Sequence, residues 1–544
     1  MKKGLFLSAI LLAFLSACGN ENEKENGSGN DQSEKQVLKI DASGEMDSMD
    51  TTVSTTNFGP MNNVFEGLMT YDLNGDLVPA DAAEEPEVSA DGLTYTFKIR
   101  EDAQWSNGTP VTAQDYVYAW RRMVDPESAA GYAYMFTGIL KNAEAINNGE
   151  EEVETLGAEA IDDKTLKVTL EKPTPYFLEV LTIPGYFPQN EDYVTEQGDE
   201  YGLNADNVIY NGPFELSDWN SAAGDSWKYV KNDAYWDKST VQLDEIDVQV
   251  IKDVGTGINL YESGDLDTIQ ITGNFVTQYK DNPDFKTYDR AWIYYVEMNQ
   301  DIPELKNENI RKALTMSIDR ASFTENVLQN GSQPIAGHVP SGLAKNPDTG
   351  ADFREEAGEV IPYDVEEAKD AWEKGLDELG TDNISFELIT SDDEESRQLA
   401  EYIQSEWQKN LSGLTISIRQ MPDNSRLDNV KKGNYQLATT YWLADFADPI
   451  NFLERFDTEI NRGNYSFADI DKLVEQSNTQ YDDALARWQT MMEIEKTALS
   501  EHHVDAPIYQ TADAYLEKPY VKDIHRPTFG STSYKYASID SEQK

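Results

Sequence analysis

The sequence has a single cysteine, Cys18, in 544 residues. With no second cysteine, intramolecular disulfides are impossible, so the stability of the folded chain must come from packing. Cys18 lies near the start of the chain, in a segment whose role is considered below. A cysteine nucleophile or a cysteine-based zinc site in the body of the protein is therefore excluded.

Motifs typical of enzymes are also missing. The sequence contains no G-x-S-x-G, H-E-x-x-H, P-loop or G-x-G-x-x-G pattern. Its four histidines are His338, His502, His503 and His525, and the adjacent pair would diverge in any regular element. We expect a binding protein without a cofactor or a metal. A secreted carboxylate hydrolase is the alternative from another class, because 100 Asp and Glu residues supply carboxylate pairs by chance.

Basic residues are scarce: 44 Lys and Arg stand against 100 Asp and Glu, giving a formal charge of −56. Such an excess of negative charge repels nucleic acid, so we expect no nucleic-acid partner. Acidic surfaces mostly serve solubility and do not by themselves identify a site. Aromatic residues make up 11% of the chain, which is ample for packed cores. A chain of this length implies two or three domains.

The N-terminus has the features of an export signal. Lys2 and Lys3 precede an apolar run over residues 4–15, which ends in "LSAC" at Cys18. This arrangement resembles the bacterial lipobox, whose cysteine is acylated and becomes the new N-terminus. The alternative is an ordinary signal peptide with a chance cysteine. We predict a signal peptide over 1–17 and a lipidated Cys18 that anchors the protein outside the cell membrane, as on a Gram-positive surface.

Residues 18–36 are predicted to be a flexible tether. After Cys18 the stretch "GNENEKENGSGNDQSEKQ" contains no large apolar side chain. Such a segment cannot bury enough surface to offset the entropy of its own ordering.

Strand and helix patterns alternate irregularly in the remainder, which favours mixed α/β domains. Leu93–Ile99 alternates apolar and polar residues, the period of a half-buried strand. An Asn-Gly turn follows, and then a helix start with Thr112 as N-cap and Asp115 three residues later. We expect one face of this helix to carry Tyr116, Val117 and Trp120.

Two further helical stripes are predicted to face the core. The first comprises Ile310, Ala313, Leu314 and Ile318, and the second Leu485, Trp488, Met492 and Leu499. The stretch "YDLNGDLVP" places Asp72, Asn74 and Asp76 as a calcium loop would, but its glycine is at the fourth position instead of the sixth. We interpret it as a hairpin turn.

The stretch "TYWLADFADPINFL", residues 440–453, holds two carboxylates three positions apart in an apolar frame. Asp445 and Asp448 could form a catalytic acid/base pair, or one could be a fixed countercharge for a cationic ligand. Asp448 precedes Pro449 and is expected to cap the turn or helix that follows.

Several of these segments resemble one known family. "ADGLTYTFKIREDAQWSNGTPVTAQDYVYAWRRMVDP" looks like the signature of the family 5 extracellular solute-binding proteins, in their oligopeptide-binding group. "YNGPFELSDW" with "KNDAYWD", "NENIRKALTMSIDR", "YDVEEAKDAWEKGLDELG" and "YWLADFADPINFL" resemble four further blocks of that family. The five blocks run in order from about residue 37 to 536, nearly the whole exported chain.

The resemblance implies an α/β, two-lobed, periplasmic-binding-protein-like (type II) hinge fold with an extra domain. Lobe I would comprise residues 37–65, 187–290 and 511–544, with an accessory domain over 66–186. Lobe II would comprise residues 291–510. Ligand would lie between lobes that close around it. The protein would be a monomer and would deliver its cargo to the membrane permease subunits of an ABC importer.

The resemblance also implies a role for one carboxylate of the pair Asp445 and Asp448. In peptide-binding members, the aspartate three residues after the tryptophan of this block pairs with the α-ammonium group of the peptide; here these residues are Trp442 and Asp445. A cation closed away from water needs such a countercharge. The peptide backbone would pair with the stretch before Trp442, including Tyr441. A second backbone partner would lie near Val53, Ser54 and Thr55.

Pocket walls implied by the same alignment are the tyrosines Tyr132, Tyr134, Tyr294 and Tyr295, although core packing explains tyrosines equally well. The sequence departs from some members of the family at Thr439. Some relatives carry an arginine at that position, where it meets the C-terminus of short peptides, so peptide length and C-terminal recognition stay open here.

The sequence thus predicts an extracellular lipoprotein that binds oligopeptides for an ABC importer. A dedicated receptor for a peptide pheromone is a close alternative, and affinity for one apolar peptide far above its scrambled version would favour it. A nickel-binding relative is disfavoured by Asp445, and a purely structural surface protein is disfavoured by the five blocks.

Overall fold

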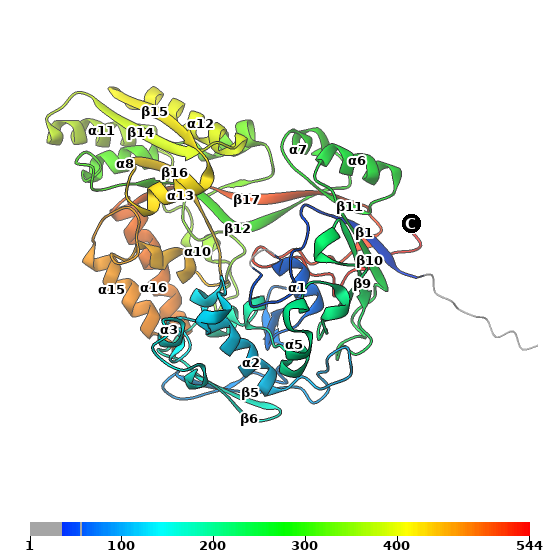
Figure 1. Cartoon of the computed structure of the whole chain (residues 1–544). Helices are drawn as coiled ribbons and strands as arrows, with labels where there is room; N and C mark the ends of the chain where they lie inside the picture. The colour runs from blue at the N-terminus through cyan, green and yellow to red at the C-terminus, as the bar shows by residue number, and fades with distance from the viewer. Residues whose placement is uncertain (1–34, 55–56) are drawn as a thin grey trace, which may run out of the picture. The chain divides into compact units, whose positions relative to one another are not determined.

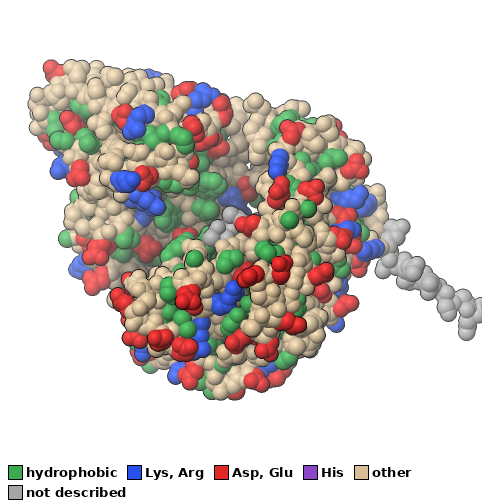
Figure 2. All heavy atoms as spheres, in the orientation of Figure 1, with side chains coloured by type: hydrophobic (Ala, Val, Ile, Leu, Met, Phe, Trp, Pro, Cys, Tyr) green, Lys and Arg blue, Asp and Glu red, His purple; other side chains and the backbone are tan. Residues whose placement is uncertain are grey.

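The computed structural model describes residues 35–54 and 57–544, of which residues 36–544 form one compact unit (Figure 1). The predicted signal peptide, Cys18, residues 18–34 of the tether and Thr55 lie outside the described residues. No helix within the described ranges is both long and apolar enough to cross a membrane. Acidic side chains are spread over the face of the molecule shown in Figure 2.

The first sheet is built from segments far apart in the chain. Its order is β1 (Val37–Ala42), β10 (Glu245–Val250), β9 (Ser226–Lys231) and β8 (Phe214–Ser217). β1 runs parallel to β10, and the other neighbours are antiparallel. Leu38, Ile40 and Ile246 point from alternate positions into the core. Helix α1 (Phe58–Val64) lies against β8.

A second four-stranded sheet carries the segment predicted as a strand. Its order is β4 (Glu87–Val88), β5 (Thr94–Lys98), β7 (Thr165–Thr169) and β6 (Ala158–Asp162), all antiparallel. Helix α2 (Ala113–Val124) packs on it and begins at the predicted cap. The Thr112 hydroxyl accepts from the Asp115 N–H at 3.3 Å, and the Asp115 carboxylate accepts from the Thr112 N–H at 2.9 Å. The predicted strand and helix start are confirmed.

The predicted hairpin is also confirmed. Strands β2 (Met69–Tyr71) and β3 (Leu77–Pro79) are antiparallel neighbours. In the turn between them, one oxygen of the Asp72 carboxylate accepts from the backbone N–H groups of Asn74 and Asp76. The described residues hold no group of three or more His, Cys, Asp or Glu that could bind a metal ion.

The largest sheet has seven strands. Along it lie β11 (Thr268–Ile271), β17 (Asp505–Glu517), β12 (Phe285–Met298), β16 (Leu437–Leu443), β14 (Ile384–Ser391) and β15 (Leu414–Met421), while β13 (Gln333–Pro334) pairs with β17. Helix α12 (Glu394–Asn410) packs on β14 and β15, and α11 (Val365–Leu379) packs on α8 (Glu308–Met316).

Shorter elements complete the chain. They include α3 (Ala143–Asn147), α4 (Phe177–Val180), α5 (Glu191–Gln197), α6 (Val254–Ser263), α7 (Asn274–Tyr279), α9 (Arg320–Ser322), α10 (Phe353–Ala357), α13 (Asp423–Lys431), α14 (Ile450–Leu453), α15 (Ala468–Thr479), α16 (Ala484–Lys496), β18 (Val521–Lys522) and β19 (Ser538–Ile539).

One of the two predicted helical stripes is partly wrong. The residues of the first stripe are all buried, although α8 ends at Met316, before Ile318. In α16, Trp488 is buried, whereas Leu485 is 38% exposed. The helix turns Arg487 and Glu495 inward instead, where each meets an opposite charge. The apolar pattern alone did not predict the orientation of α16, because these buried ion pairs also determine which face of the helix points inward.

The pairing of β12 with β17 is interrupted halfway. Asp289 pairs with Ala512 and Ile293 with Gln510, so the register shifts between them. Arg290 lies in this interruption and donates from its two terminal nitrogens to the carbonyl oxygens of Pro527 and Gly530, at 3.0 and 3.1 Å. The segment that follows β18 is thereby fixed against the middle of β12.

Candidate ligand-binding site

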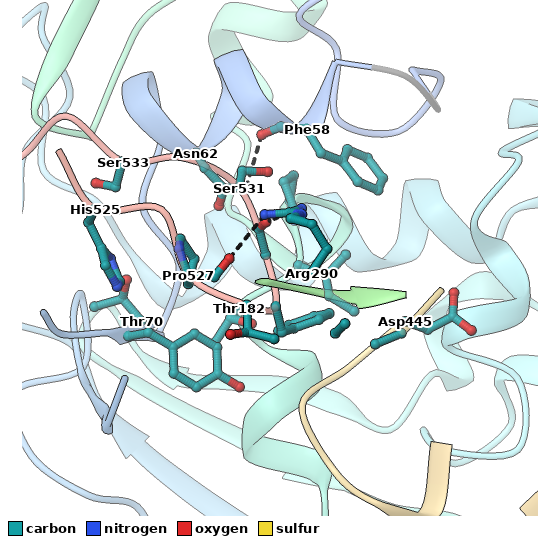
Figure 3. A pocket seen from close by; sticks show the side chains of 18 of the residues that line it. Phe58, Asn62, Thr70, Thr182, Arg290, Asp445, His525, Pro527, Ser531 and Ser533 are labelled. Carbon is teal, nitrogen blue, oxygen red and sulfur yellow. Dashed lines mark hydrogen bonds between the residues drawn. The ribbon is translucent and has the colours of Figure 1, made fainter. Parts of the chain in front are cut away.

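A cavity of about 280 Å³ is lined by residues from seven separate parts of the chain (Figure 3). Representative lining residues are Phe58, Tyr132, Arg290, Leu443, Asp445 and Phe529. In Figure 3, Asp445 and His525 lie on opposite sides of the view, with Arg290 between them. Asp445 is the only carboxylate among the described lining residues. A pair of carboxylates for hydrolysis is therefore not formed in this cavity.

Asp445 is placed by the loop that follows β16. Asn451 holds that loop, because its side-chain oxygen accepts from the backbone N–H of Asp445 at 3.1 Å and from Trp442 Nε1 at 3.0 Å. The Tyr134 hydroxyl lies 3.5 Å from Asp445 Oδ1, to which it donates. The backbone at Asp445 is therefore fixed, and the carboxylate lies at one side of the cavity with the Tyr134 phenol beside it (Figure 3).

The Asp445 carboxylate forms no ion pair with any described side chain. Burial raises the pKa of its carboxyl group, and hydrogen bonds from Asn451 and Tyr134 oppose this shift in part. No positively charged side chain of the described chain contributes to the shift. An ionised Asp445 is thus destabilised in the empty cavity, and a cationic ligand would relieve that cost.

Asp448, three residues later, has a different environment. Arg487 Nη1 and Nη2 donate to its two oxygens at 2.7 and 2.9 Å, and both side chains are buried. Asp448 Oδ1 also accepts from the Ile450 N–H at 2.9 Å, so the predicted cap is confirmed. The ion pair with Arg487 was not predicted, because its partner lies 39 residues away in the sequence.

Trp442 faces away from the Asp445 cavity. It lines a separate cavity of about 200 Å³ together with Asn451, Arg455 and Arg462. Both arginines lie over its ring, each 5.8 Å from the centroid. Its contact with the site passes through Asn451, so Trp442 positions the Asp445 loop and does not itself line the cavity.

Tyr441 and Tyr294 are brought together, since they are direct partners across β16 and β12. With Trp292 and Tyr509 they form an aromatic cluster whose ring centroids are 4.8–5.9 Å apart. The Tyr441 hydroxyl donates to Asp423 Oδ2 at 3.0 Å. None of these four residues lines the Asp445 cavity. Figure 2 shows hydrophobic side chains in a hollow on this face of the molecule.

Tyr132 does line the cavity with Asp445. Its ring lies 4.7 Å from that of Phe58 and 5.5 Å from that of Tyr134. Tyr295, by contrast, is fully buried beneath Arg455, so it belongs to the core.

The backbone partner predicted before α1 is a turn in the structure. Val53 is 47% exposed and Ser54 is buried, and neither lines the cavity. Thr55 lies outside the described residues. At the position where some relatives carry arginine, Thr439 is buried and donates to Thr390 Oγ1 at 2.7 Å. Its side chain therefore forms a hydrogen bond within the sheet and does not line the cavity.

Sequence reasoning missed Phe58, Arg290 and Asn451. Asn451 lies in the block that drew attention to Asp445, but nothing in the sequence indicates that its side chain folds back on that loop. Arg290 is a single basic residue in a strand, and its contacts with Pro527 and Gly530 span more than 230 residues. Such long-range contacts leave no local signal.

Comparisons with known proteins agree with this geometry. The family model described as "Bacterial extracellular solute-binding proteins, family 5 Middle" matches residues 76–464. The dipeptide-binding protein DppE of Bacillus subtilis is 34% identical over 535 residues, covering 97% of both chains. The oligopeptide-binding protein OppA of the same organism is 34% identical over 558 residues, covering 99% of both.

Solved structures extend the likeness to three dimensions. Listeria monocytogenes OppA bound to peptide is 42% identical, with a TM-score of 0.71 over 93% of this chain and 99% of that one. The pheromone receptor PrgZ is 35% identical, with a TM-score of 0.72 over the same shares. The unliganded open form of the murein tripeptide-binding protein MppA is only 27% identical but reaches 0.81, over 93% and 98%. The backbone therefore matches an open form better than a peptide-bound one.

Proposed function

The chain belongs to family 5 of the bacterial extracellular solute-binding proteins, and from this premise we propose that it captures oligopeptides outside the cytoplasm and delivers them to the permease of an ABC importer. Its fold is the mixed α/β, type II binding-protein fold that the sequence predicted. The names of its relatives, which include dipeptide- and oligopeptide-binding proteins, support peptide as the ligand class.

The observation that carries this proposal is the carboxylate of Asp445, which has no cationic partner among the described residues. Nearly every peptide ends in an α-ammonium group, and a buried ammonium requires a countercharge. A hydrogen bond to a charged partner contributes about 1.5–3 kcal/mol. Asp445 would therefore fix one end of the peptide whatever its sequence. Tyr132 and Phe58 would supply apolar walls that accept varied side chains.

A binding role without chemistry is part of the proposal. The family is one of solute-binding proteins, and the cavity offers one carboxylate instead of a catalytic pair. A pheromone receptor is the second candidate, favoured by the 35% identity with PrgZ. Affinity for one apolar peptide far above that for its scrambled form would select it over a general receptor.

The test is the change Asp445→Asn, which keeps the size of the side chain and removes its charge. Calorimetric titration with a free peptide should show an affinity about 10- to 150-fold lower than wild type, the factor that corresponds to 1.5–3 kcal/mol. The N-acetylated peptide should bind both proteins equally. Asp428→Asn, an exposed carboxylate paired with Lys432, is the matched control and should change neither. An equal loss for free and acetylated peptides would contradict the role of Asp445.

Attachment to the membrane is proposed through Cys18, which lies outside the described residues. Cys18→Ser should release the protein into the medium with peptide binding intact, as immunoblots of cell and medium fractions would show. Continued retention on the membrane would rule out a lipid anchor. The division into lobe I (37–65, 187–290, 511–544), accessory domain (66–186) and lobe II (291–510) stays a prediction, as does the monomeric state.

A further inference from the structure

A second, larger cavity adjoins the one that holds Asp445. Its volume is about 830 Å³, and the two share the walls formed by Tyr71, His525 and residues 527–529. The rings of Tyr71 and Phe529 meet edge to face with centroids 6.3 Å apart. The loop that carries Asp445 continues into the second cavity, whose lining includes Asp448. A ligand held at Asp445 therefore lies next to this space.

The cationic side chains that line the second cavity already have partners. Lys345 Nζ lies 2.7 Å from Asp76 Oδ1, and Arg487 forms the double contact with Asp448. Arg526 pairs with Glu517 at 2.6 Å. Among the acidic lining residues, Asp352 accepts backbone N–H groups at the start of α10, and Glu355 lies in that helix.

Glu179 differs from these residues. It lies on α4 and lines the second cavity, yet its Oε2 atom is enclosed and has no hydrogen-bond partner in the described protein. No ion pair to Glu179 occurs within the described residues either, and Arg487 is already bound to Asp448. Glu179 thus has an enclosed carboxyl oxygen with no partner among the described residues, and leaving such an atom unpaired costs free energy.

Burial disfavours the ionised form of Glu179 while the cavity is empty. Burial raises the pKa of its carboxyl to about 8, with smaller increases from Asp448 and Glu85 and an opposing effect of Arg487. The nearby Tyr71 phenol has a raised pKa as well, through burial and the charge of Glu179. At neutral pH the group is mostly protonated, and a cation placed beside it would drive off the proton.

We propose that the second cavity is a subsite for a basic side chain of the bound peptide, in which Glu179 pairs with the ammonium of a lysine or the guanidinium of an arginine. This deepens the proposed function and rests on it. Asp445 and Asp448 are three residues apart, a span of at most about 11 Å for an extended chain. An extended peptide whose amine is at Asp445 covers that span in about three residues. Because Asp448 lines the same cavity as Glu179, the basic residue should lie within about the first three positions.

The experiment compares lysine with norleucine, which has the same length without the charge. One uncharged hexapeptide carries either residue at positions two to five in turn, and binding to the full exported chain is measured by calorimetry. At one of these positions wild type should prefer lysine by about tenfold or more. Glu179→Gln should abolish that preference and leave norleucine affinity unchanged, which also shows that the variant is folded.

The pH dependence supplies a readout that a merely structural role of Glu179 would not give. From pH 6 to 8.5 the ratio of lysine to norleucine affinity should rise in wild type, because Glu179 becomes ionised. The ratio should stay flat in Glu179→Gln. Titration of the peptide amine, and of Asp445, affects both peptides alike and cancels in the ratio.

The outcomes separate this inference from the proposed function. Peptide binding without a lysine preference at any position would overturn the subsite and leave the function standing. Failure of wild type to bind any peptide would overturn both. Binding of 1,4-diaminobutane without peptide, dependent on Glu179, would assign the cavity to a free amine and overturn the peptide assignment. Asp445→Asn should weaken the lysine and norleucine peptides equally.

Discussion

Asp445 and Asp448 lie in the same loop but have opposite electrostatic environments. Asp448 is buried with both oxygens bound by Arg487, whereas Asp445 is half-buried beside a phenol and an amide, with no cationic partner among the described residues. A carboxylate with an internal cation contributes to the folded state itself. One without such a cation raises the energy of the empty protein and lowers it again when a cationic ligand arrives. The presence or absence of a partner arginine thus separates a structural acid from a binding acid.

The largest effect, on the free energy of unfolding, should come from breaking the ion pair between Asp448 and Arg487. Arg487→Met keeps much of the side-chain length but leaves Asp448 buried without a cation, close to Glu179. Removing one partner of a buried pair destabilises by about 3–5 kcal/mol. Urea denaturation followed by circular dichroism should show this fall in the free energy of unfolding.

The matched control for that change is Asp445→Asn, three residues away. It removes a charge that no described side chain neutralises, so the free energy of unfolding should be unchanged or slightly higher at neutral pH. A loss as large as that of Arg487→Met would show that Asp445 also holds the fold together and would erase the distinction drawn here.

An intermediate effect, on peptide affinity, should follow from protonating the Asp445 carboxylate. Because burial raises the pKa of Asp445 above the ordinary value near 3.9, its charge is lost at a higher pH than for most aspartates. Affinity for free peptides is present above that pKa and falls as the pH drops through it, by as much as the 1.5–3 kcal/mol of the ammonium contact. Calorimetry at several pH values would measure this.

Two features sharpen the pH test. Above about pH 8 the peptide amine itself loses its proton, so affinity should decline on that side also. N-acetylated peptides should show neither limb. An acid limb that persists in Asp445→Asn would assign the titration to another group.

The smallest effect should come from the neighbour of Asp445. Tyr134→Phe removes the hydroxyl 3.5 Å from the carboxylate, and we expect a loss of about 0.5–1.5 kcal/mol in peptide affinity. Tyr363→Phe, at a half-exposed tyrosine outside the cavity, is the control and should bind as wild type does. A gain in affinity would indicate that the phenol competes with the peptide amine.

Local patterns were the most predictable part of the molecule. The capping box of Thr112 and Asp115, the hairpin after Tyr71 and the strand Thr94–Lys98 each depend on a few neighbouring residues, and the structure has them as predicted. The cap formed by Asp448 belongs to the same class. Hydrogen bonds between residues close together in the sequence can be predicted from local sequence patterns.

The site was predictable only in part, because its contacts join distant segments. The family resemblance singled out Asp445, and the structure places it in a cavity with Tyr132. The resemblance did not indicate that Trp442 faces another cavity and acts through Asn451. It also gave no sign of Glu179, whose surroundings in the second cavity come from several segments far apart in the chain. Which carboxylate lacks a partner is a property of the folded chain alone.

The interruption between β12 and β17 has a mechanical consequence. The residues between the paired halves are bonded outward instead: Ala291 accepts from the Ala444 N–H at 2.9 Å and donates to the Thr528 carbonyl at 2.7 Å. This stretch of β12 has no ladder pairing with β17, so a bend here would leave the paired residues on either side in register. The loop that carries Asp445 and the Thr528 segment that lines its cavity are both hydrogen-bonded to Ala291. A rotation of β12 at this point would therefore move the Asp445 loop and residues 527–530 together, because both are hydrogen-bonded to it.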